Sequence, residues 1–188
     1  GYGNEKEVGE GIRRSGIDRR ELFITTKVNT TEMRGGTVRQ SLDKSLADLG
    51  TDYIDLVLIH WPVQGHIKET WQILEEYVDK GKIRSIGVSN FKVHHLEALK
   101  ALGGVQPMVN QIEMHPYYID DEMLEYAKKN NMVVEAWSPL MRGKQIITDP
   151  VIVNMAEKYG VSPAQLTIRY LTQYGVRVIV KSNNPVHL

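Results

Sequence analysis

The chain is organised around one short apolar segment that ends abruptly. Residues 54–59 are apolar at every position but Asp55, and His60, Trp61 and Pro62 follow directly. A nearly continuous apolar run of this length is typical of a strand buried on both faces, as in a parallel sheet. Because proline cannot continue a central strand, the strand is expected to end before Pro62. His60 and Trp61 are therefore predicted at its carboxyl end, where α/β folds bind ligands.

Five further segments repeat this pattern, separated by stretches with helical periodicity. We expect strands at 22–27, 54–59, 82–88, 109–112, 132–137 and 176–180. We expect helices at 37–49, 69–79, 93–99 (begun by Ser89 and Asn90), 120–130, 151–159 and 163–174. Such alternation indicates βα units and a parallel sheet, either an open doubly wound sheet or a (β/α)8 barrel. The chain has neither of the glycine-rich phosphate loops that would favour the open sheet.

Composition limits the class of protein and its partners. The 188 residues suffice for one domain with a sizeable core. Lys+Arg and Asp+Glu number 23 each, which gives no indication of a nucleic-acid or anionic-membrane partner. No apolar run approaches the ~20 residues needed to cross a bilayer, and no signal peptide is visible. The absence of cysteine excludes disulfides.

Polar and aromatic side chains gather at the predicted strand ends. They are Lys27, His60, Ser89, Asn90, Gln111, Trp137, Ser138, Lys181 and Ser182. In a barrel these ends meet at one mouth. Lys27 is the most informative, because burying an ammonium group is costly unless it is paired, although a lysine can also extend to solvent. Taken singly, His60 fits the rim of a core equally well, and it has no third partner beside His66 for a metal site.

Seven segments taken together resemble the aldo-keto reductase family, and in particular its 2,5-diketogluconate and glyoxal reductase-like branch. They are YGNE at 2–5, LFITTK at 22–27, DLVLIHWP at 55–62, GKIRSIGVSNF at 81–91, VNQIEMHP at 109–116, EAWSPL at 135–140 and VKS at 180–182. The segments follow one another over essentially the whole chain. The resemblance implies a (β/α)8 TIM barrel, with six of its eight strands in this chain and residues 1–188 forming a single incomplete domain.

The resemblance also implies a reaction, the reduction of aldehydes or ketones by hydride from NADPH, with NADH possible. Tyr2 matches the general acid that protonates the carbonyl oxygen, and a buried ammonium at Lys27 would favour loss of the phenol proton. His60 matches the residue that orients the substrate carbonyl, which predicts a neutral imidazole N–H facing that oxygen. Trp61 matches a wall of the substrate pocket. Asn29 stands where many members carry a pocket tryptophan, which predicts a more polar pocket.

Contacts to the nicotinamide follow from the same resemblance. Ser89, Asn90 and Gln111 match the residues that hold its carboxamide. Trp137 matches the aromatic residue that stacks on the ring and fixes which face is offered to the substrate. These four residues are therefore expected to orient the hydride donor.

Contacts to the phosphates are implied in the same way. The backbone around Ser138 and Leu140 lies where the family wraps the pyrophosphate, and Lys181 and Ser182 match the cluster that contacts the 2′-phosphate of NADPH. His187 stands near a position where the family usually has arginine. Because histidine lacks the planar fork of a guanidinium, the preference for NADPH over NADH stays open.

The resemblance has gaps as well as matches. The aspartate that pairs with the lysine in the family would precede Gly1, as would two strands, and the C-terminal helix would follow Leu188. We therefore expect these residues to be an incomplete barrel that alone is poorly stable or associates. The intact parent is expected to be a cytoplasmic monomer acting on small carbonyl compounds, without nucleic-acid or membrane partners. The alternative is a non-catalytic family member, or inactive fragment, that binds nucleotide.

Overall fold

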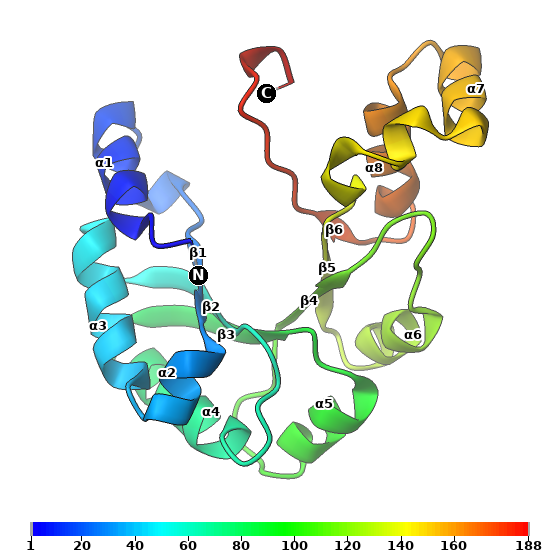
Figure 1. The fold of residues 1–188 in the computed structure, drawn as a ribbon. Helices are drawn as coiled ribbons and strands as arrows, with labels where there is room; N and C mark the ends of the chain where they lie inside the picture. The colour runs from blue at the N-terminus through cyan, green and yellow to red at the C-terminus, as the bar shows by residue number, and fades with distance from the viewer. Residues whose placement is uncertain (1, 188) are drawn as a thin grey trace. The chain divides into compact units, whose positions relative to one another are not determined.

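The structure is a computed structural model that describes residues 2–187, and in it helices alternate with parallel strands (Figure 1). The helices are α1 (Glu5–Ser15), α2 (Thr30–Gly35), α3 (Val38–Leu49), α4 (Ile67–Asp79), α5 (Val93–Lys100), α6 (Asp121–Lys129), α7 (Pro150–Tyr159) and α8 (Pro163–Thr172). The strands are β1 (Thr25–Val28), β2 (Ile54–Ile59), β3 (Ile83–Ser89), β4 (Val109–Glu113), β5 (Val133–Trp137) and β6 (Arg177–Val178). The chain divides between Val109 and Asn110 into two compact units.

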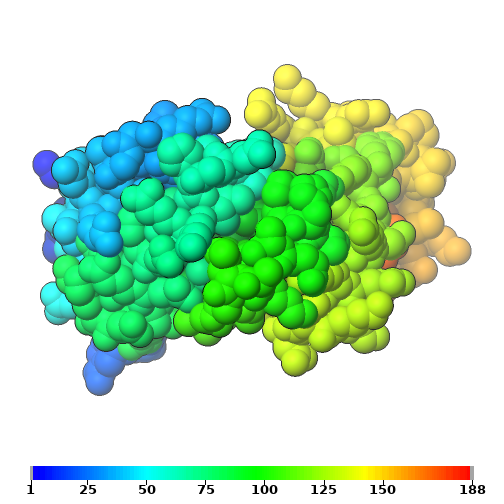
Figure 2. All heavy atoms as spheres, turned by 90° about the horizontal axis from the view of Figure 1, so that it is seen from below, coloured from blue at the N-terminus to red at the C-terminus, as the bar shows by residue number. Residues whose placement is uncertain are grey.

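The first unit is built on the parallel strands β1, β2 and β3. All six residues of β2 are buried, as expected for the middle strand of the three. Helix α3 contacts β1 and α4 contacts β3, so both helices cover the sheet from the outside. Trp71, Leu74 and Tyr77 form the buried face of α4, and the Trp71 indole N–H donates to the Val105 carbonyl at 3.0 Å. Figure 2 shows this covered side, where the blue-green atoms of α4 form a closely packed surface.

The second unit contains β4, β5 and β6, which are neighbours in the sheet in that order. Helix α6 packs on β5, α8 packs on β6, and α7 packs on α8. Ser162 begins α8 with a capping box in which its hydroxyl accepts from the Gln165 N–H, as its sequence predicts. Among residues 2–187, no helix is long and apolar enough to cross a bilayer.

Most expected elements are confirmed, and the differences have local causes. Strand β1 begins at Thr25 and not at residue 22, and a 3₁₀ turn, η1 (Arg19–Glu21), lies shortly before it. Helix α5 is capped by Lys92 and not by Ser89 and Asn90. Asn90 has a left-handed backbone (φ 62°), which cannot start a helix. Strand β6 covers only two residues of the expected 176–180, because only Arg177 and Val178 pair with β5.

Helix α1 was not expected from the sequence pattern, and it packs through a glycine. Gly9 is its one buried residue and lies against the C-terminal end of α3. A Cβ atom at Gly9 would be 2.5 Å from the Asp48 carbonyl oxygen and 2.8 Å from that of Leu49. The helix therefore approaches its neighbour with backbone where other helices use an apolar stripe.

Replacing Gly9 with alanine should destabilise the first unit, because the added methyl group clashes with carbonyl groups that a helix cannot move freely. We expect a loss of about 1–3 kcal/mol in the free energy of unfolding, measured by urea denaturation. Gly11→Ala is the matched control, since nothing lies within 4 Å of a Cβ atom there. It should gain about 0.5–1 kcal/mol from helix propensity. Equal effects of the two substitutions would contradict the close packing of α1.

Candidate active site

The carboxyl ends of β1, β2 and β3 lie side by side at one edge of the first unit. Val28 is opposite Ile59, and Ile59 is opposite Val88. The His60 N–H donates to the Val28 carbonyl at 3.0 Å, and the Asn90 Nδ2 donates to the His60 carbonyl at 3.0 Å. The structure thus brings together Lys27, His60, Ser89 and Asn90, as the spacing of the strands predicts.

The imidazole of His60 is half-buried at this edge and has a defined partner. Its Nδ1 lies 3.1 Å from the Asn29 Oδ1, and its ring centroid lies 6.5 Å from that of Trp61, which is 46% exposed. Burial, and after it the positive charge of Lys27, lower the pKa of His60 from its ordinary value of 6.5. His60 is therefore mainly uncharged at neutral pH, and the positive charge of Lys27 contributes to this.

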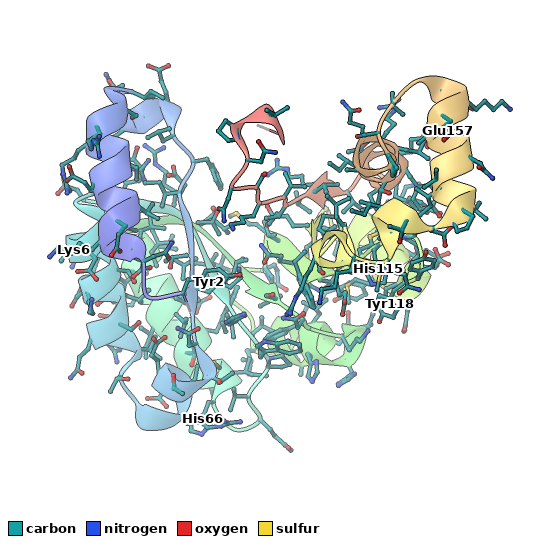
Figure 3. The ribbon with its side chains drawn as sticks, turned by 45° about the horizontal axis from the view of Figure 1, so that its top comes forward. Tyr2, Lys6, His66, His115, Tyr118 and Glu157 are labelled. Carbon is teal, nitrogen blue, oxygen red and sulfur yellow. The ribbon has the colours of Figure 1, made fainter. Side chains whose placement is uncertain are left out.

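The side chain of Tyr2 is open to solvent in the structure. Its side chain is 97% exposed, and it makes no hydrogen bond to any other residue between 2 and 187. Figure 3 shows Tyr2 on the segment that leads into α1. Of the three residues expected to act together, the structure thus brings Lys27 and His60 near each other and leaves the phenol open to solvent.

Glu5 ties the segment that carries Tyr2 to β1. Its carboxylate accepts from the Thr26 hydroxyl at 2.5 Å and from the Ser45 hydroxyl at 2.8 Å. Thr26 directly precedes Lys27 in β1, so this anchor lies next to the cluster. Glu5 belongs to the YGNE segment, but the pattern alone gave it no role.

Ser89 and Asn90 are two polar residues at the carboxyl end of β3, and their side chains are hydrogen-bonded to each other. Ser89 is 1% exposed, and its hydroxyl accepts from the Asn90 Nδ2 at 3.0 Å. The left-handed backbone at Asn90 turns the chain away from the strand and allows its side-chain amide to reach back to His60. Such amide and hydroxyl groups can recognise a carboxamide, which both donates and accepts hydrogen bonds.

In the second unit, Gln111 is held inside the sheet. It is 4% exposed, and its Nε2 donates at 3.0 Å to the carboxylate of Glu135, which is 7% exposed. Because a carboxylate only accepts, this contact fixes which way the amide of Gln111 points. Trp137 ends β5 half-buried, and its carbonyl accepts from the Met114 N–H at 3.3 Å.

The loop that follows β5 has an unusual backbone. Ser138, Met141 and Arg142 have positive φ angles of 56°, 46° and 60°. Left-handed residues in a turn can aim backbone N–H groups at an anion, and the pyrophosphate contact at Ser138 and Leu140 stays a prediction.

The segment after β6 carries the other expected phosphate contacts. Lys181 is exposed there, and the Ser182 hydroxyl accepts from the Asn184 N–H at 3.0 Å. The side chain of His187 lies outside the described residues. Between residues 2 and 187, no three His, Asp or Glu side chains are grouped as a metal site would require.

Two partner residues at the site were missed from the sequence. Glu32 binds Asn29, and Glu135 binds Gln111. The first pair had a signal, since Asn29 and Glu32 have the spacing of a capping box at the start of α2. The second pair joins two strands, and no local pattern indicates it.

The chain has the architecture of α/β proteins that place their sites at the carboxyl edge of a parallel sheet, and a lysine, a histidine and an amide lie at that edge. The model of the Aldo/keto reductase family matches residues 2–188. The chain belongs to this family. Its fold is accordingly that of the family's (β/α)8 barrel, of which residues 2–187 contain six strands.

Individual relatives agree with this assignment. The chain is 45% identical over 185 residues to the uncharacterized oxidoreductase YtbE of Bacillus subtilis, covering 96% of this chain and 66% of that protein. It is 48% identical over 181 residues to glyoxal reductase of the same organism, covering 96% and 65%. A solved Gox0644 variant in complex with NADPH is 40% identical with a TM-score of 0.91, covering 99% and 68%. The chain thus spans just under two thirds of the two curated relatives.

Proposed function

We propose that the protein containing this chain is an NADPH-dependent oxidoreductase that reduces aldehydes or ketones to alcohols. The observation that carries the proposal is the meeting of Lys27, His60 and Asn90 at the ends of three adjacent strands. A relative named as a glyoxal reductase and a neighbour solved with NADPH support this substrate class and cofactor. The proposed substrate is a small carbonyl compound.

Each proposed catalytic residue of this chain has a separate role in the reaction. NADPH, when bound, supplies the hydride. We assign to the Tyr2 phenol the proton that neutralises the carbonyl oxygen, to Lys27 the positive charge that favours its release, and to His60 the hydrogen bond that orients the oxygen. Trp61, exposed beside His60, is assigned to the wall that contacts the rest of the substrate.

The cofactor contacts are proposed separately for each unit. In the first unit, Ser89 and Asn90 would bind the carboxamide of the nicotinamide. In the second, Gln111 is assigned a contact to the nicotinamide and Trp137 the stacking on its ring. The phosphates would be bound by the remaining residues, Ser138, Leu140, Lys181 and Ser182.

The proposal is tested by following NADPH absorbance with methylglyoxal as substrate, using the intact protein. Lys27→Met should lower kcat by at least about 100-fold, because it removes the charge that assists proton transfer. Lys68→Met is the matched control, since Lys68 is exposed on α4, and it should leave kcat unchanged. If NADPH quenches the fluorescence of Trp137 but no carbonyl is reduced, the protein is a nucleotide-binding family member and not a reductase.

A further inference from the structure

The carboxylate of Glu135 is buried in the second unit and has an amide as its partner. Glu135 lies in β5, and its Oε2 accepts from the Nε2 of Gln111 in β4 at 3.0 Å. Both side chains are buried. Burying a carboxylate is costly unless hydrogen bonds replace those it made to water, and a hydrogen bond to a charged group is stronger than one between neutral groups. The pair is therefore a strong polar contact between two neighbouring strands.

This contact determines which end of the Gln111 amide faces Glu135. An ionised carboxylate only accepts hydrogen bonds, so the NH₂ end of the amide faces it. The carbonyl oxygen, at the other end of the same planar group, then points away from Glu135. That oxygen has two lone pairs, so it can accept from a ligand in addition to a protein donor. Gln111 thus offers an acceptor on the side away from Glu135.

The pair lies on the same face of the sheet as Trp137. Successive side chains of a strand point to opposite faces, so Glu135 and Trp137, two residues apart in β5, share a face. Gln111 reaches Glu135 and therefore lies on that face too. Under the proposed function, Trp137 stacks on the nicotinamide ring. The oxygen of Gln111 is then on the side of the sheet where the ring would bind.

We propose that Glu135 is a positioning residue that holds the Gln111 amide with its oxygen toward the nicotinamide, so that the site accepts a carboxamide on the ring and rejects a carboxylate. The proposal rests on the proposed function. The NH₂ group of a carboxamide donates to the oxygen of Gln111. A carboxylate has only acceptors, so it would face that oxygen without a hydrogen between them, and the negative charge of Glu135 would repel it.

The selectivity is measured as the ratio of two dissociation constants, obtained from tryptophan fluorescence of the intact protein. The probes are NADP⁺ and its deamidated form, nicotinic acid adenine dinucleotide phosphate, in which a carboxylate replaces the carboxamide. We expect NADP⁺ to bind about 10- to 100-fold more tightly, the range for a buried polar group left without a partner. A ratio near one would overturn the proposal.

Glu135→Gln should reduce this ratio about tenfold, mainly because the deamidated form binds more tightly. The new amide has nearly the shape of the carboxylate, but it can donate as well as accept, so Gln111 can turn its NH₂ group toward the ligand. Glu113→Gln is the matched control. Glu113 lies in β4, but its side chain is 44% exposed and lies 3.5 Å from the His115 Nε2. Equal changes in the two variants would show that charge alone sets the ratio, which would contradict the role of the Gln111 amide.

The orientation of Gln111 is also measured without any ligand, by NMR of the uniformly ¹⁵N-labelled protein. We expect a side-chain NH₂ proton of Gln111 to be shifted downfield and to exchange slowly with water, because it is buried against a carboxylate. In Glu135→Gln the proton should move upfield. A Gln111 amide that exchanges rapidly, or has the same shift in both proteins, would overturn the role of Glu135.

Activity distinguishes this proposal from the proposed function. If NADP⁺ is preferred and the preference depends on Glu135, but no carbonyl is reduced, the proposed function fails while the role of Glu135 stands. If carbonyls are reduced but Glu135→Gln leaves the ratio of dissociation constants unchanged, the proposed function stands and the role of Glu135 is wrong.

Discussion

Replacing Tyr2 with phenylalanine should abolish carbonyl reduction and leave NADPH binding within about threefold of the original. The substitution removes only the phenol hydroxyl, the proposed source of the proton, and general acid catalysis is typically worth about 10²–10⁴ in rate. The hydroxyl makes no hydrogen bond within residues 2–187, so its loss should not disturb the fold. The kcat with methylglyoxal and the dissociation constant from tryptophan fluorescence give the two quantities.

Tyr159→Phe is a suitable control for this substitution. Tyr159 is 66% exposed at the end of α7 and has no proposed part in the reaction. The control should keep full kcat. If Tyr2→Phe loses NADPH binding together with turnover, Tyr2 contributes to binding and its assignment as the proton donor is wrong.

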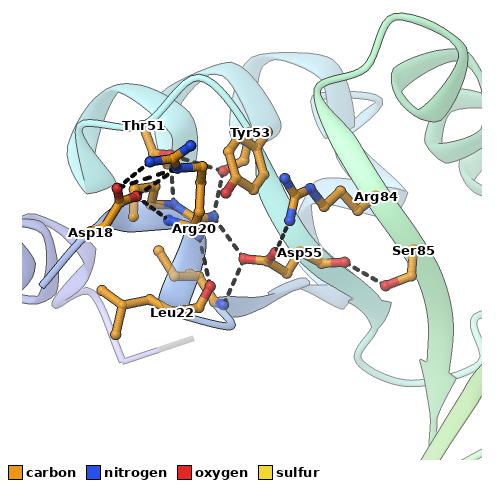
Figure 4. A network of polar contacts seen from close by, with 10 residues as sticks. Asp18, Arg20, Leu22, Thr51, Tyr53, Asp55, Arg84 and Ser85 are labelled. Carbon is orange, nitrogen blue, oxygen red and sulfur yellow. Dashed lines mark hydrogen bonds and ion pairs between the residues drawn. The ribbon is translucent and has the colours of Figure 1, made fainter.

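Replacing Asp55 with alanine should cost the first unit about 3–5 kcal/mol in the free energy of unfolding, because it leaves a partly buried guanidinium without its carboxylate. The side chain of Asp55 is 3% exposed and accepts from the Arg19 Nη2 at 2.7 Å and from the Ile24 N–H at 2.9 Å (Figure 4). Arg84 adds a longer contact of 3.3 Å, and both guanidinium groups lie 4.0 Å from the ring of Tyr53. Urea denaturation followed by circular dichroism measures the loss.

Asp18→Ala is the matched control for Asp55→Ala. Asp18 pairs with Arg20 at 2.6 Å, but this pair is exposed and screened by solvent, so its removal should change stability little. If the two substitutions lower stability equally, the buried network around Asp55 does not stabilise the start of β2.

The strands could be predicted where burial alone determines them. Strand β2 has its expected bounds. All of its residues are buried, and burial of a whole strand can be predicted from a run of apolar residues. Strand β6 is shorter than expected because its length depends on pairing with β5, which the sequence of 176–180 does not contain. Helix α1 was missed because it packs through Gly9 and needs no apolar stripe.

The same distinction applies to the site. The position of Lys27 beside His60 could be predicted, because parallel strands place their carboxyl ends together. The contact between Gln111 and Glu135, and the one between His60 and Asn29, depend on side chains from different elements. Their partners and the direction of each hydrogen bond therefore required the structure.

We propose that the edge formed by β1, β2 and β3 supports hydride transfer to a carbonyl carbon. It is tested most directly with NADPH that carries deuterium at the transferable position of its nicotinamide, incubated with the intact protein and methylglyoxal. Mass spectrometry should find one deuterium on the former carbonyl carbon of the alcohol, and none should be found with the Tyr2→Phe protein. An alcohol without deuterium, or bound NADPH with no alcohol formed, would contradict the account.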